Sequence, residues 1–146
     1  MSDSNGVSEG DGWTVALDAD ALGEGYGFRS VRKPLKVTEF GVNLITIPPG
    51  YTTGSHAHER QQELYFVHRG AIEMRFGDGA KTEIREGGAA RVDATTVRGI
   101  RNLSDSEDAQ FLVVGAEGGY VGRDGVLPEG EENPRGPGFP DGSTSP

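Results

Sequence analysis

The chain has 146 residues, 34% of them hydrophobic, and its 23 acidic and 14 basic residues give a formal net charge of −9. This length allows one domain with a real core, while the scattered basic residues exclude a nucleic-acid-binding surface, which requires clustered Lys and Arg. The absence of cysteine excludes disulfides and thiolate chemistry, so any bound metal must be held by nitrogen and oxygen atoms.

Both ends of the chain are rich in Gly, Pro, Ser and acidic residues, a composition typical of disordered segments. We expect a disordered tail over 1–12, one folded domain over 13–127, and a disordered acidic Gly/Pro-rich tail over 128–146. No apolar run approaches the roughly 18 residues of a membrane helix, and the N-terminus lacks the apolar core of a signal peptide. We therefore expect a cytoplasmic protein without membrane contact.

The predicted domain consists of short segments with strand character. In "WTVALDADAL", Asp18 or Asp20 is placed to cap one helical turn. Runs rich in β-branched and aromatic residues follow, each about as long as a strand and separated from the next by turn residues. They cover 28–32, 40–47, 63–69, 71–77, 81–86, 89–94, 97–102 and 109–115. Asp78-Gly79 predicts a tight hairpin turn with positive φ angles. The pattern indicates an all-β sandwich or barrel.

All three histidines of the chain lie in "GYTTGSHAHERQQELYFVHRG", residues 50–70. His56 and His58 are two residues apart, so on an extended chain they point the same way and can share one ion. Glu63 opens the next predicted strand and supplies a carboxylate. If Glu63 points inward, so do Tyr65 and Val67, and His68 falls on the outer face with a surface or interface role. Two imidazoles and one carboxylate leave coordination positions open, which suits Fe(II) and hydrolytic or Lewis-acid metals.

This arrangement, G-x5-H-x-H-x4-E-x6-G over Gly50 to Gly70, matches the first motif of the cupin family without a gap. The second cupin motif, G-x5-P-x-G-x2-H-x3-N, aligns with "GGAARVDATTVRGIRN". Gly87 and Asn102 fit it, but Asp93, Thr95 and Arg98 replace its proline, second glycine and histidine. The chain thus resembles a small single-domain cupin over about 28–115, with an intact first motif and a degraded second one.

The resemblance implies a double-stranded β-helix, or jelly-roll barrel, with a divalent metal (Fe, Mn, Ni or Zn) on His56, His58 and Glu63. It also implies a homodimer, for which the outward Leu64 and Phe66 offer a surface. Cupins include dioxygenases, isomerases, decarboxylases and sensing domains, so the fold does not choose a reaction. Two hypotheses stay open: a metal-dependent enzyme, and a non-catalytic binding or sensing protein that in one version is metal-free, with an Arg98–Glu63 ion pair.

Arg98 stands where the family has its third histidine, and alternation with Ile100 directs it to the barrel interior. Three arrangements are open: Arg98 pairs with Glu63, leans toward the barrel mouth, or is offset by the carboxylate on the metal. We favour the second, in which Arg98 and Tyr65 face the cavity and the guanidinium binds an anionic small-molecule ligand.

Overall fold

The fold is given by a computed structural model, which describes residues 6–116 of the chain. Its elements, in chain order, are β1 (Val7–Gly10), β2 (Trp13–Ala16), the 3₁₀ helix η1 (Ala19–Leu22), β3 (Gly27–Ser30), α1 (Arg32–Leu35), β4 (Gly41–Ile47), β5 (Gln62–Arg69), β6 (Ala71–Phe76), β7 (Lys81–Arg85), β8 (Ala89–Val92), β9 (Arg98–Asn102) and β10 (Ala109–Ala116). The strands expected from turn punctuation are all present, as β3 to β10. The predicted helical turn is η1, and the Asp18 side chain caps it by accepting from the Ala21 amide at 3.1 Å.

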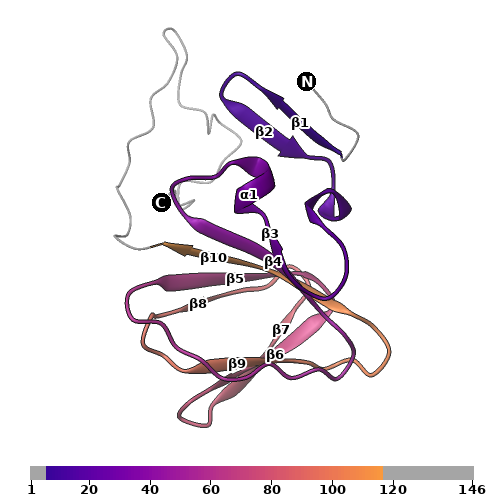
Figure 1. The fold of residues 1–146 in the computed structure, drawn as a ribbon. Helices are drawn as coiled ribbons and strands as arrows, with labels where there is room; N and C mark the ends of the chain where they lie inside the picture. Colours follow the sequence, from indigo (N-terminus) through magenta and orange to yellow (C-terminus); the bar gives the residue numbers. More distant parts are fainter. Residues whose placement is uncertain (1–5, 117–146) are drawn as a thin grey trace, which may run out of the picture.

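Two antiparallel sheets form the barrel (Figure 1). One has the order β3-β4-β10-β5-β8 and the other the order β7-β6-β9. The inward side chains of both sheets make one apolar core, whose fully buried members include Val67, Ile72, Met74 and Phe111. The sequence prediction of an all-β, jelly-roll type of domain is confirmed.

The N-terminal segment adds structure that the sequence did not predict. Residues 7–10 were expected to belong to a disordered tail, but they form β1, which pairs with β2 from Val7↔Ala16 to Gly10↔Trp13. α1 was also unexpected, because the strand predicted over 28–32 ends at Ser30 and Arg32 begins this helix, which contains Pro34. Such a short helix tolerates proline near its start, where an amide has no partner inside the helix. The expected tail over 128–146 and the end of the domain at 127 lie outside the described residues.

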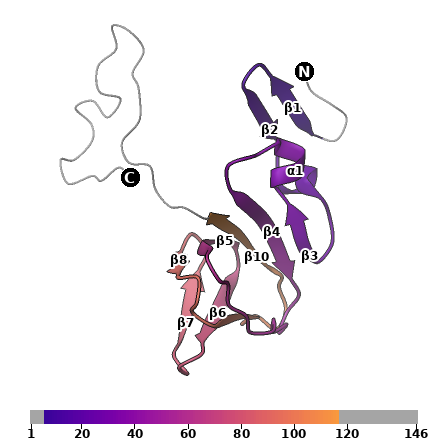
Figure 2. The ribbon, with the colours of Figure 1, turned by 60° about the vertical axis from the view of Figure 1, so that its left-hand side comes forward.

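A second, smaller apolar cluster joins this segment to the barrel. Leu22 and Leu35 of the N-terminal segment pack around Val42 and Leu44 of β4, together with Leu112 of β10. The outer face of β4 and β10 is therefore covered by the chain's own N-terminal part, which stands beside β3 and β4 in Figure 2.

Strand β5 shows the alternation that positions the site. Glu63, Tyr65 and Val67 are buried, whereas Leu64 and Phe66 are 46% and 39% exposed on the outer face. His68 is also exposed, as predicted. A glycine with φ +75°, Gly70, then turns the chain from β5 into β6.

The hairpin between β6 and β7 differs from the predicted turn in one detail. Gly79 has φ +91°, but Asp78 does not have a positive φ. The Asp78 carboxylate instead accepts a hydrogen bond from the Ala80 amide at 2.9 Å, which stabilises an ordinary φ at this position.

Within the described range, no helix is long and apolar enough to cross a membrane.

Candidate metal centre

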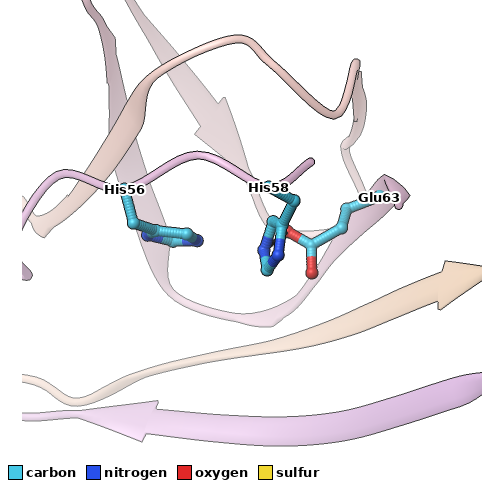
Figure 3. Close-up of side chains that lie close together, drawn as sticks. All are labelled: His56, His58 and Glu63. Carbon is cyan, nitrogen blue, oxygen red and sulfur yellow. Dashed lines mark ion pairs between the residues drawn. The ribbon is translucent and has the colours of Figure 1, made fainter. Parts of the chain in front are cut away.

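The two motif histidines are held in place by main-chain hydrogen bonds to the segment 94–98, which runs beside them. His56 exchanges two such bonds with Arg98, each of 2.9 Å, and the His58 amide donates to the Ala94 carbonyl at 2.7 Å. The extended backbone between them directs both rings to the same side (Figure 3). Their centroids lie 5.2 Å apart with the ring planes at 88°.

Glu63 completes the group. One ligand atom from each of His56, His58 and Glu63 lies within 4.8 Å of the others. His58 Nε2 is buried and lies 3.3 Å from Glu63 Oε1, but it makes no hydrogen bond with any residue of the range 6–116. A nitrogen without a hydrogen bond beside a carboxylate fits a divalent ion held between the two side chains. The predicted trio therefore comes together in space.

The Glu63 carboxylate is oriented by groups behind it. Its Oε1 accepts a hydrogen bond from the Tyr65 hydroxyl at 2.7 Å and another from Arg98 Nη2 at 2.8 Å. Its Oε2 has one long contact, 3.5 Å, with Gln61 Nε2. Because Oε1 is already engaged twice, Oε2 is the oxygen with free lone pairs for a metal ion.

Arg98 is fully buried and all three of its nitrogens have acceptors. Its Nε donates to the Tyr65 hydroxyl at 3.2 Å, and its Nη1 donates to the Thr96 and Ala94 carbonyls at 2.6 and 3.2 Å. Its Nη2 is the partner of Glu63. The guanidinium therefore adopts the first of the three arrangements considered, the ion pair with Glu63. The second arrangement, which we favoured, is not the one observed. The guanidinium does not point toward the barrel mouth, because it donates hydrogen bonds to the backbone carbonyls of residues 94 and 96.

The titration of the site groups follows from these contacts. Burial raises the pKa of Glu63, but hydrogen bonds from Tyr65 and Arg98 outweigh it and hold that pKa below its ordinary value. Burial, and then the bond to Glu63, raise the pKa of Tyr65 to about 12 despite the opposing effect of Arg98. Burial, followed by the charge of Arg98, lowers the pKa of His56. The site thus offers a carboxylate and, at His56, a neutral imidazole, which are the protonation states that a metal ion needs.

A cavity of about 520 Å³ opens beside the trio. His56, His58, Gln61, Glu63 and Tyr65 line one part of it. The sequence identified four of these residues and missed Gln61. The signal for it was available, since Gln61 precedes Glu63 by two positions and so falls on the same face of an extended chain.

These features define a small β-barrel protein with a candidate metal centre of two histidines and one glutamate. A family model described as a cupin domain matches residues 43–115, which is half of the chain. The chain therefore belongs to the cupin superfamily. None of the curated proteins matches the sequence.

Three solved structures illustrate the likeness. A cupin protein from Bacteroides fragilis has a TM-score of 0.62 and 22% identity, over 73% of this chain and 92% of that one. A Klebsiella pneumoniae protein with a double-stranded β-helix domain has a TM-score of 0.59 and 25% identity, over 69% and 88%. A sugar phosphate isomerase of the cupin superfamily from Silicibacter pomeroyi has a TM-score of 0.56 and 25% identity, over 73% of this chain and 60% of that protein.

Proposed function

We propose that the protein binds a divalent metal ion through His56, His58 and Glu63, and binds a small molecule in the adjoining cavity. The observation that carries this proposal is the buried His58 Nε2, which lies 3.3 Å from the Glu63 carboxylate and has no hydrogen-bond partner among the described residues. An unsatisfied buried nitrogen beside a carboxylate is costly unless a third partner joins them. A bound ion would supply Lewis-acid chemistry and open positions for a ligand or O₂.

The role of the surrounding residues follows from their contacts. Tyr65 and Arg98 fix one carboxylate oxygen of Glu63 and leave the other to face the metal. The positive charge of Arg98 is neutralised by Glu63, which weakens its repulsion of a dication. Since the donors of Arg98 are occupied, we propose that the anionic head group of a ligand binds the metal directly. A metal-dependent enzyme of the dioxygenase or isomerase type is the function we favour.

A second candidate is a metal-free binding or sensing protein, in which the ion pair itself completes the site. The observation in its favour is the Arg98–Glu63 contact of 2.8 Å, which satisfies the carboxylate without any metal. In that case the histidines serve as polar groups of the cavity wall.

The metal content of the natively purified protein separates the two candidates. We expect close to one divalent ion per chain by inductively coupled plasma mass spectrometry. His56→Ala and His58→Ala should each lose most of it while the far-UV spectrum stays unchanged, because both side chains lie outside the apolar core. His68→Ala is the matched control, since the third histidine is exposed on the outer face. Equal metal content in all four proteins would place the ion elsewhere and contradict the proposal.

A further inference from the structure

Away from the metal trio, most of the cavity wall is apolar, and Asn43 and Thr53 are polar residues within it. Ile45, Ile47, Ile100, Phe111 and Val113 line it, and each of them is buried. They come from β4, β9 and β10, so the apolar wall extends across both sheets. A volume of about 520 Å³ falls within the range of small-molecule pockets, ~300–1,000 Å³. The interior therefore has room for an apolar group next to the metal-binding end.

Two aromatic residues at the cavity are exposed. Phe28 and Tyr51 both line it, yet 76% and 50% of their surfaces are open to solvent. A bound molecule that filled the cavity would contact both rings. Aromatic rings contribute large apolar contact area in this way and are common in ligand pockets.

The described residues give the cavity no free Lys or Arg to receive a second anionic group. Among residues 6–116, no Lys or Arg lines it, and the nitrogens of Arg98 are all bonded elsewhere. A phosphate dianion or a second carboxylate placed on this wall would lose its hydration without an ion-pair partner. Within residues 6–116, negative charge is therefore best placed at the metal-binding end.

We infer that the ligand is a small molecule with one acidic, metal-directed head group and an apolar, aromatic or branched body. The body lies on the Ile and Phe wall and is covered by Phe28 and Tyr51. This inference rests on the proposed metal site. The mostly apolar wall offers few partners for the hydroxyl groups of a sugar, so we expect phosphorylated sugars to bind poorly, although one cupin similar to this chain is a sugar phosphate isomerase.

Two hydroxamic acids test the inference, because they share a metal-binding head and differ only in the body. Protein loaded with Co(II) is titrated with benzohydroxamate and acetohydroxamate, and the visible spectrum of the metal reports binding. Burial of a phenyl ring in place of a methyl group should tighten binding by at least about 10-fold. Glucose 6-phosphate at the same concentrations should leave the spectrum unchanged.

Variants locate the body of the ligand. Phe28→Ser and Tyr51→Ser should each reduce the benzohydroxamate preference about 3-fold or more, with little change for acetohydroxamate. Phe40→Ser is the matched control, because this phenylalanine is 43% exposed and does not line the cavity. Equal affinities for the two hydroxamates, or tighter binding of glucose 6-phosphate, would overturn the inference while the metal site stands.

A binding experiment on the metal-free protein distinguishes failure of the inference from failure of the proposed function. If the protein takes up no metal, the proposed function fails, and uncharged indole becomes the probe in amide correlation spectra. Shifts at Ile100 and Val113 with indole, and none with glucose 6-phosphate, would support an apolar ligand without metal. An absence of indole shifts at these cavity residues would overturn the inference as well.

Discussion

The Tyr65 hydroxyl bridges the two charged groups behind the metal trio. It donates to Glu63 Oε1 at 2.7 Å and accepts from Arg98 Nε at 3.2 Å, in a part of the site where Tyr65 is only 2% exposed. A hydroxyl that serves as donor and acceptor at once keeps both partners satisfied where water is excluded.

Tyr65→Phe should therefore destabilise the protein by about 1–3 kcal/mol, because two buried polar atoms each lose a partner. The free energy of unfolding is measured by urea denaturation. Tyr26→Phe is the control, since Tyr26 is 62% exposed and its 3.0 Å bond to Asp108 competes with water. Its effect on the free energy of unfolding should be clearly smaller than that of Tyr65→Phe. A loss of the same size in both variants would contradict the bridging role.

The Arg98–Glu63 pair is the second feature of the site at this scale. Arg98→Met should cost about 3–5 kcal/mol, since it leaves the Glu63 carboxylate buried without its cation. Glu63→Gln should be costly for the converse reason. The double variant should be more stable than the sum of the two losses implies, by about 1 kcal/mol or more.

This double-mutant cycle isolates the pair. Arg98→Met also removes the donor to the Thr96 and Ala94 carbonyls, but that loss is common to the single and double variants and cancels. Unfolding of all four proteins is followed in urea after metal is removed with a chelator. If the losses of unfolding free energy were strictly additive, Arg98 would contribute to stability only through its hydrogen bonds to the carbonyls of residues 94 and 96.

The sequence predicted the site residues but not all of their partners. Alternation along β9 correctly directs Arg98 inward, and the cupin motif brings His56, His58 and Glu63 together. Whether the Arg98 guanidinium points into the cavity or pairs with Glu63 depends on the orientation of the carbonyls of residues 94 and 96. That orientation is set by a local turn of the backbone. Nothing in the residue types of that turn specifies it.

At the level of secondary-structure elements, the glycines of the two cupin motifs allow the backbone to turn between strands. Gly50, Gly70 and Gly87 have φ values of +71°, +75° and +85°, a conformation that side chains with a Cβ rarely adopt. Gly70 is the most restricted of them, because an added Cβ would lie 3.0 Å from the Asp108 carbonyl oxygen. It joins β5, which carries Glu63, to β6 in the other sheet.

Gly70→Ala should destabilise the protein by about 1–3 kcal/mol through backbone strain and this close contact. Thermal unfolding followed by circular dichroism measures the effect. Gly54→Ala is the control, since Gly54 has no positive φ and an added Cβ there meets nothing within 4 Å. An equal drop in melting temperature for both variants would show that the turn conformation is not what restricts residue 70.

Strands were easier to predict than the N-terminal segment. In β3 to β10 the apolar runs are bounded by turn residues, so pattern and structure coincide. β1 has the sequence VSEG and lies in an acidic, glycine-rich stretch whose composition resembles a disordered tail. It is ordered because its partner β2 is only two residues away, across Asp11 and Gly12, which makes pairing local.

For the molecule as a whole, the outer face of the larger sheet is half covered. Two apolar rows run across it, Val42–Val114–Leu64 and Leu44–Leu112–Phe66. The N-terminal segment packs on their β4 and β10 members, while Leu64 and Phe66 on β5 stay exposed. We propose that a second copy of the chain covers this remaining part, because the same apolar rows on two copies can pack against each other about a twofold axis.

Replacement of an exposed residue in this face should therefore separate the copies without unfolding either one. We expect the wild type to have the molar mass of a dimer by size-exclusion chromatography with light scattering, and Phe66→Asp to have that of a monomer, because a carboxylate would be buried against apolar side chains. Leu103→Asp is the control, since Leu103 is also exposed, at 41%, but lies outside the larger sheet. A wild-type monomer, or a dimer that survives Phe66→Asp, would show that this face does not join two copies.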